Sequence, residues 1–297
     1  MMRRHVAPVE NGLNRTAHKG TPPDRRRPAD RLRHHYEVER ALADRLRSAS
    51  SRLERARIYG TMYDTLFAEV PDHPGLVLRD TPDEVARRNH RKLRLLAPFL
   101  TPGSRALEIG AGDCSFGVEL SPRIRFVCGV EISAKGTRLD GAPRNFALVL
   151  YDGFEFPFAA RSFDLAFSDQ LLEHLHPDDA ELHFRAVARA LVSGGTYLLR
   201  TPHRFTGPHD ISRYFTRGNA EGFHLKEWTY RELNAALRAS GYRHVCAIWN
   251  ARGFSARLPI GWVCALEVVL GPLPRALRRG LSLLPLPGIV VAARTPR

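Results

Sequence analysis

The sequence predicts an α/β protein with a doubly wound, mostly parallel sheet, and two observations lead to this fold class. After Pro102, short apolar runs alternate along the chain with polar or helical stretches. One of the helical stretches opens with Thr229-x-x-Glu232, a helix-capping pattern. Strands that alternate with helices require crossover connections, and such connections give parallel strands with helices on both faces of the sheet.

The individual elements follow from the same kinds of pattern. Residues 30–57 contain no glycine or proline and repeat large apolar side chains at helical spacing, so they predict a helix. Thr81-Pro82-Asp83-Glu84 predicts the start of another helix, which runs to about Leu96. The expected strands are residues 105–109, 125–132, 146–151, 163–168, 196–200 and 245–249, and the helices expected between them include 178–191 and 229–240.

Charge divides the 297-residue chain, which has a net charge of +14, into three parts. Residues 1–58 hold 15 basic and 7 acidic residues, residues 251–297 hold 7 and 1, and the centre is neutral. The neutral centre argues against an active centre that binds polyanions. The basic ends, in contrast, are able to contact nucleic acid or an anionic membrane surface.

Cysteines and apolar runs indicate the compartment. The four cysteines include no C-x-x-C pair, which argues against a disulfide framework and against a cysteine zinc site. The N-terminus lacks the apolar region of a secretory signal, and no apolar run approaches the roughly 20 residues that span a bilayer. We therefore expect a cytoplasmic protein.

The clearest functional pattern is a glycine turn after residues 105–109. Gly110 and Gly112 allow a positive φ and let a ligand approach the backbone N–H groups at the start of a helix. Glu131 ends the next expected strand, where a carboxylate can accept both hydroxyls of a ribose. Ser115 stands where a dinucleotide site has its third glycine, and no charge nearby suits a pyrophosphate.

Three acidic residues indicate which kind of nucleoside cofactor the site suits. Glu108 precedes the glycine turn, Glu131 follows the second expected strand, and Asp152 follows the third. An acid in front of the glycine turn repels phosphate but suits a cationic group. This set favours a ligand that has an amine, a ribose and a base but no phosphate, and S-adenosyl-L-methionine fits that description.

The segment Glu108-Ile-Gly-Ala-Gly-Asp-Cys114 resembles the first motif of the class I S-adenosylmethionine-dependent methyltransferases, of the type 11-like group. Segments 151–158, 162–168, 172–175 and 192–195 are also similar, so the resemblance covers about residues 85–250. It implies a seven-stranded, Rossmann-like sheet whose last two strands, residues 242–249 and 288–294, are antiparallel. One departure from the family pattern is Cys114, which replaces the third glycine.

The resemblance also implies cofactor roles for individual residues. Glu108 would serve the methionine amino group, Glu131 the ribose and Asp152 the adenine. The full set of expected cofactor-binding residues is Glu108, Gly110, Ala111, Gly112, Glu131, Ile132, Asp152, Gly153 and Asp169.

His174 and His224 are the candidate catalytic residues, and three interpretations of them stay open. Both histidines can brace loops, or one of them can accept a proton from the substrate. With Gln170 and Glu173 they also resemble the metal ligands of the small-RNA 3′-terminal 2′-O-methyltransferases. Those enzymes have an acid where this chain has Gln170, and a neutral amide weakens a hard-cation site, so we expect no metal.

We expect a flexible basic arm (1–29), a helical cap (30–82) and a methyltransferase domain (83–297) with an apolar helical insertion at about 255–286. The insertion contains Trp262, many leucines and Arg278-Arg279. It can pack on the body, dock on the N-terminal helix as a lid, or make peripheral contact with a membrane.

The expected reaction is methyl transfer from S-adenosyl-L-methionine to a small hydroxylated or amine-bearing molecule. An RNA methyltransferase, whose basic ends would bind nucleic acid, is one alternative. A protein that binds S-adenosylmethionine without catalysis is another. The sequence leaves the oligomeric state open.

Overall fold

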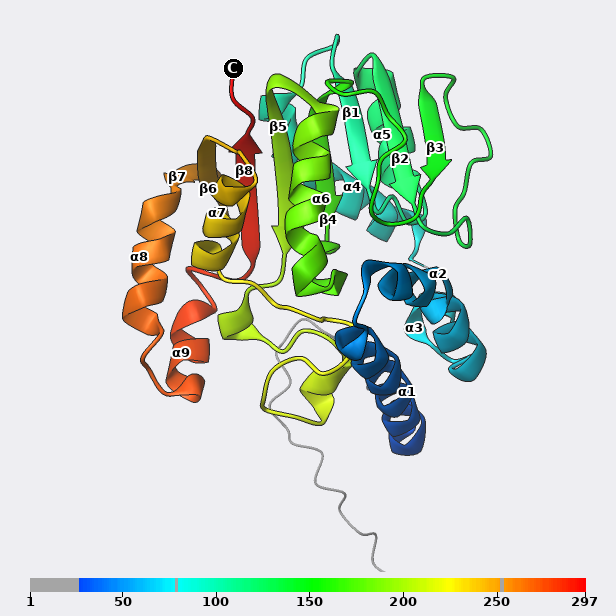
Figure 1. The fold of residues 1–297 in the computed structure, drawn as a ribbon, viewed down its shortest axis with the longest axis vertical. Coiled ribbons are helices and arrows are strands. Elements are labelled where there is room, and N and C mark those ends of the chain that lie inside the picture. The colour runs from blue at the N-terminus through cyan, green and yellow to red at the C-terminus, as the bar shows by residue number, and fades with distance from the viewer. Residues whose placement is uncertain (1–26, 78–79, 252–253) are drawn as a thin grey trace, which may run out of the picture.

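The computed structural model describes residues 27–77, 80–251 and 254–297 (Figure 1). All but the last three residues of the expected basic arm therefore lie outside the described residues. The helices are α1 (Ala29–Ser48), α2 (Arg52–Glu69), α3 (Pro74–Val77), α4 (Pro82–Leu96), α5 (Ser115–Leu120), α6 (Pro177–Ala190), α7 (Tyr230–Ala239), α8 (Ile260–Leu270) and α9 (Arg275–Ser282). The strands are β1 (Arg105–Ile109), β2 (Phe126–Glu131), β3 (Phe146–Leu150), β4 (Phe163–Asp169), β5 (Leu191–Thr201), β6 (His244–Ala251), β7 (Phe254–Pro259) and β8 (Ile289–Arg294).

One eight-stranded sheet, in the order β3-β2-β1-β4-β5-β8-β6-β7, forms the centre of the molecule. Strands β1 to β5 are parallel, whereas β8 lies antiparallel between β5 and β6. The predicted doubly wound fold is confirmed, with one strand more than the seven expected. The additional strand is β7, which opens the segment expected to be helical and pairs with β6, covering an edge that would otherwise be unpaired.

Helices cover both faces of this sheet because β1 buries side chains on both sides. Leu107 packs in one apolar core with Phe184 of α6 and Leu233 of α7. Its neighbour Ala106 points the other way and packs with Phe116 of α5 in a second core. Figure 1 shows α6 and α7 in front of the sheet and α4 and α5 behind it.

The helix expected over residues 30–57 is instead two helices. Ala49 and Ser51 have extended backbone conformations, and the Ser51 side chain accepts a hydrogen bond from the N–H of Glu54. This cap starts α2, which continues to Glu69. The pair α1–α2 lies beyond the ends to which β1 and β2 point, at the carboxyl edge of the sheet (Figure 1).

The apolar insertion forms α8 and α9 at the opposite flank from β3 (Figure 1). Helix α8 packs on α7, β6 and β7, so its inner side is buried against the body rather than against the N-terminal helices. Among the described residues, no helix is both long enough and apolar enough to cross a bilayer.

Candidate active site

The glycine turn joins β1 to α5 at the carboxyl edge of the sheet. Gly110 and Gly112 have φ angles of +72° and +55°, in the left-handed region that glycine adopts without strain. Cys114, directly before α5, also has a positive φ of 64°. The N–H groups of Gly110 and Ala111 donate to the carbonyl of Val130 at 3.0 and 3.2 Å, which ties the turn to β2.

Glu131 at the end of β2 is oriented by this turn. One carboxylate oxygen accepts a hydrogen bond from the Gly112 N–H at 2.9 Å, and the other accepts from the Ile132 N–H at 2.8 Å. Each oxygen retains a lone pair for a further donor. The carboxylate is therefore pre-oriented to accept hydrogen bonds from two neighbouring hydroxyl groups.

A pocket of about 290 Å³ opens beside these residues. The predicted residues that line it are Gly110, Gly112, Glu131, Ile132, Gly153, Asp169 and His174. The predicted residues outside its lining are Glu108, Ala111, Asp152 and His224.

Glu108 and Asp152 both have structural contacts. Glu108 is buried beneath the turn, where a Cβ added to Gly117 would lie 2.8 Å from its Oε2. Burial raises the pKa of Glu108 to about 8, so a cationic group placed close to it would favour its ionised form. Asp152 is exposed, and its Oδ1 accepts hydrogen bonds from the N–H groups of Phe154 and Glu155, both at 2.9 Å.

Helix α2, which lies within the segment expected to be a helical cap (30–82), covers the pocket. One face of this helix forms what we call the roof: Tyr59, Met62, Tyr63, Asp64 and Phe67. The spacing of the four large side chains is typical of one side of a helix, but the pattern alone does not say what that side covers.

Two contacts fasten the roof to the sheet domain. The Tyr59 hydroxyl accepts a hydrogen bond from the N–H of His176 at 2.7 Å. One turn earlier, Arg55 donates two hydrogen bonds to the Asp179 carboxylate in α6, at 2.6 and 2.5 Å, and both side chains are buried. This bidentate pair fixes the position of α2 over the pocket.

Asp169 ends β4 at the pocket wall between two cations. Its carboxylate lies 3.2 Å from Lys92 Nζ and 3.3 Å from Arg200 Nε. The next residue, Gln170, has a positive φ of 57° and also lines the pocket. The ion pairs hold the chain where it turns away from the sheet.

The structure brings His174 and His224 together, with ring centroids 5.0 Å apart. His174 Nδ1 lies 3.1 Å from the carbonyl oxygen of Phe223, and His224 Nδ1 lies 3.0 Å from Glu227 Oε1. Both partners only accept hydrogen bonds, so both Nδ1 atoms carry protons. In each neutral ring, Nε2 is therefore the atom with the free lone pair.

The environments of the two rings differ. Burial and the adjacent His224 lower the pKa of His174 to about 3, so this pocket-lining ring is neutral at pH 7. Burial also opposes protonation of His224, but the hydrogen bond to Glu227 and the nearby charges of Glu173, Asp210 and Glu227 together outweigh this effect and raise the pKa. Burial raises the pKa of the adjacent Glu173 to about 7, and Thr201 Oγ1 donates to its Oε2 at 2.9 Å. Potential ligand atoms of Glu173, His174 and His224 lie within 4.8 Å of one another.

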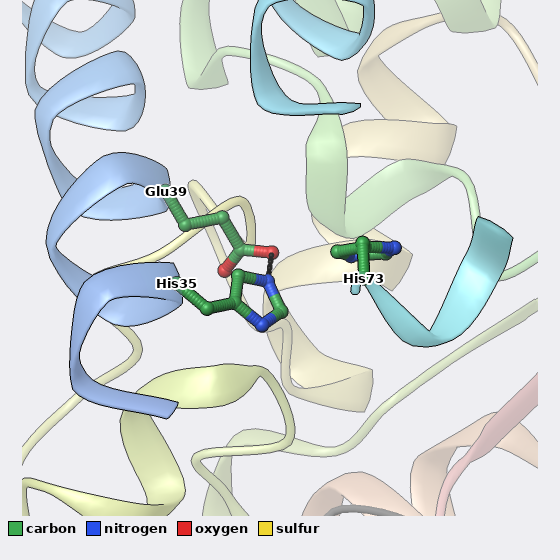
Figure 2. A group of neighbouring side chains, drawn as sticks. All are labelled: His35, Glu39 and His73. Carbon is green, nitrogen blue, oxygen red and sulfur yellow. Dashed lines mark ion pairs between the residues drawn. The ribbon is translucent and has the colours of Figure 1, made fainter. Parts of the chain in front are cut away.

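A second histidine group, His35, Glu39 and His73, lies between α1 and α3 (Figure 2). Its hydrogen bonds oppose metal binding. Arg27 Nη1 lies 2.8 Å from His35 Nδ1, and the Gly75 N–H donates to His73 Nδ1 at 2.9 Å. A neutral ring whose Nδ1 accepts a hydrogen bond carries its own proton on Nε2, so no lone pair is left for a metal. His35 Nε2 lies 3.5 Å from Glu39 Oε1 on the same helix, and the His35 ring packs edge-on against His73, with ring centroids 4.7 Å apart, directly before α3.

Comparisons with known proteins agree with this geometry. Residues 107–199 match the family model described as a methyltransferase domain. The demethylmenaquinone methyltransferase of Corynebacterium efficiens is 33% identical over 134 residues, which are 44% of this chain and 55% of that protein. The chain thus spans about half the length of this curated relative.

Solved structures resemble the fold at low identity. Phosphoethanolamine N-methyltransferase 1 of Haemonchus contortus, in complex with phosphoethanolamine and S-adenosylhomocysteine, superposes with a TM-score of 0.52 at 15% identity, covering 82% of this chain and 50% of that one. The cyclase SpnF superposes with a TM-score of 0.51 at 18% identity, covering 81% and 97%. These likenesses show the fold.

The sheet order and the pocket at the carboxyl ends of β1 and β2 define a Rossmann-like α/β domain. Within it, residues 107–199 are the segment that matches the methyltransferase-domain family model.

Proposed function

We propose that this protein transfers a methyl group from S-adenosyl-L-methionine to a small hydroxylated or amine-bearing molecule. The observation that carries the proposal is a single pocket in which the glycine turn and the oriented Glu131 carboxylate face His174 and Gln170. The family match and the name of the C. efficiens relative support methyl transfer as the reaction.

The pocket suits the cofactor in charge and in shape. Gly112 leaves open space where any other residue would have a Cβ, and Glu131 is a ready acceptor for two ribose hydroxyls. Buried Glu108 places an ionisable acid under the turn, where it would favour the cationic amino group. When bound, the cofactor supplies an electrophilic methyl group, and the protein's task is to position the acceptor.

His174 is the residue that we assign to the acceptor. It lines the pocket, and its neutral Nε2 would accept a hydrogen bond from a hydroxyl or amine. His224, held by Glu227, stands behind it as the stronger base. A proton lost by the acceptor would therefore have a path from the pocket wall into this pair.

Cofactor binding is tested first by calorimetry with S-adenosylhomocysteine. We expect Glu131→Ala to weaken binding by at least about 1.4 kcal/mol, or tenfold, whereas Asp140→Ala, at an exposed loop position, leaves it unchanged. Equal affinity in folded Glu131→Ala protein would overturn the assignment. Labelled S-adenosylmethionine incubated with fractionated cell extract then identifies the acceptor class. Binding without any transfer would favour the non-catalytic alternative.

One observation favours a second candidate, a metal-assisted RNA methyltransferase. Ligand atoms of Glu173, His174 and His224 lie within 4.8 Å of one another, and Glu173 Oε1 is buried and has no hydrogen-bond partner among the described residues. Oriented imidazoles and a carboxylate are suitable metal ligands, although Gln170 offers only an amide. Stimulation of methyl transfer by Mn²⁺, with RNA binding that weakens steeply with salt, would support this candidate. Activity unaffected by chelators would exclude the metal.

A further inference from the structure

The insertion that forms α8 and α9 has an unusual outer surface. Exposed fractions are 71% for Trp262, 69% for Val269 and 70% for Leu284. More than half of the large apolar side chains exposed in the described chain lie between residues 262 and 284. We call this surface the apolar flank: Trp262, Val268, Val269, Leu277, Leu281, Leu283 and Leu284.

The flank is not simply the outside of an ordinary amphipathic helix. On α8, Ile260, Val263 and Leu270 face inward, yet the outward positions are apolar as well. Apart from the buried Glu267, α8 is apolar on all sides, and such a helix is normally buried on every side. Large apolar side chains exposed together on one segment are typical of an interaction site.

The single acid of this region points away from the flank. Glu267 is the only acidic residue in 251–297, and it is buried. Its carboxylate lies 2.7 Å from His203 Nε2 and accepts hydrogen bonds from the N–H groups of Tyr230 at 2.5 Å and Arg231 at 2.9 Å. The inner side of α8 is thereby anchored to α7 and to the loop after β5, and no negative charge faces outward.

The remaining charged residues of the insertion are all basic and favour an anionic partner. Between Glu267 and Arg294 the only charged residues are Arg275, Arg278 and Arg279, all on α9. Apolar side chains with an outer tryptophan and adjacent arginines are typical of helices that lie in the interface of an anionic bilayer. A second copy of this chain would instead bring two basic segments face to face, which like-charge repulsion opposes.

We propose that the apolar flank docks on the surface of an anionic phospholipid membrane, with α8 and α9 lying in the plane of the interface. Docking would hold the loop after β5 near the lipid, because Arg278 of α9 lies 4.8 Å from the Phe205 ring and Arg275 donates to the carbonyl of Gly218. The proposal does not depend on which molecule is methylated.

Flotation of the full chain with lipid vesicles tests the proposal. We expect binding to vesicles of phosphatidylcholine with phosphatidylglycerol, and weaker binding to phosphatidylcholine alone. The variant W262S/V269S/L284S should bind at least about tenfold more weakly. The control L53S/L139S/L182S removes exposed apolar side chains elsewhere and should bind like the unchanged protein.

Tryptophan fluorescence separates flank insertion from binding through the basic N-terminal residues. Trp228 is buried and Trp249 half-buried, so a blue shift on vesicle addition should come from Trp262 and disappear in W262F. Unaltered flotation of the triple serine variant would overturn the proposal. So would the finding that the unchanged protein is a dimer without lipid and the triple serine variant is a monomer.

Discussion

The bidentate pair between Arg55 and Asp179 should control both stability and cofactor affinity. Removing one partner of a buried pair costs about 3–5 kcal/mol because the other charge is left buried and unpaired. Asp179 lies in the first turn of α6, where the helix dipole stabilises a carboxylate by about 0.3–1 kcal/mol. We therefore expect Arg55→Met to lower the free energy of unfolding by about 2–4 kcal/mol.

The same substitution should loosen the roof, because Arg55 is one helical turn from Tyr59. We expect the dissociation constant of S-adenosylhomocysteine to rise at least about tenfold, which is 1.4 kcal/mol. Urea denaturation measures the first effect and calorimetry the second. The double variant Arg55→Met/Asp179→Leu should recover most of the stability, since an apolar pair can replace a buried ion pair.

Arg52→Met is the matched control, because Arg52 pairs with the exposed Glu155 and its loss should cost less than about 1 kcal/mol. If Arg55→Met unfolds at the same urea concentration as the unchanged protein and binds the ligand equally well, the pair does not hold the roof.

Three further predictions concern the glycine turn. A Cβ added to Gly129 would lie 2.9 Å from Ala111, so Gly129→Val should displace the turn and weaken S-adenosylhomocysteine binding at least about tenfold; unchanged affinity by calorimetry would contradict this. The pKa of Glu108, raised from 4.5 to about 8, contributes stability that is fully present below pH 4.5 and is lost as the pH rises toward 8, by about 3 kcal/mol at pH 7. Glu108→Gln should remove that pH dependence from the urea midpoint of unfolding. If the midpoint changes with pH by the same amount in both proteins, the raised pKa of Glu108 is refuted. Lys92→Met removes a positive charge that favours ionised Glu108, so the pKa of Glu108 should rise and the loss of stability should continue to higher pH. An unchanged plot of urea midpoint against pH would show that Lys92 has no such influence.

Seven of the eight strands could be predicted because each is a short apolar run between polar segments, whereas β7 lies where a helix was expected. Strand β5 begins at Leu191, earlier than expected. The early start was not predicted because Gly194 and Gly195 interrupt the residue pattern that marks a strand. The break between α1 and α2 was missed because residues 30–57 contain no glycine or proline, although Ser51-x-x-Glu54 is itself a helix-capping pattern.

The site was predictable where local sequence determines it. The glycine turn and Glu131 lie next to one another because consecutive parallel strands end at the same edge. The roof depends on contacts such as that of Arg55 with Asp179, which join positions far apart in the chain, and a single sequence does not reveal them. Glu108 is adjacent to the turn in sequence, yet its side chain is buried and does not line the pocket.

The position of β8 has a consequence for biosynthesis. This strand lies between β5 and β6, yet it is translated after both of them. Until it emerges from the ribosome, the nascent sheet keeps an open edge at β5, whose backbone N–H and C=O groups on that side have no strand to pair with. Strand β8 therefore completes the sheet and also removes an edge that could pair with other chains. Truncation before Ile289 should yield insoluble chains.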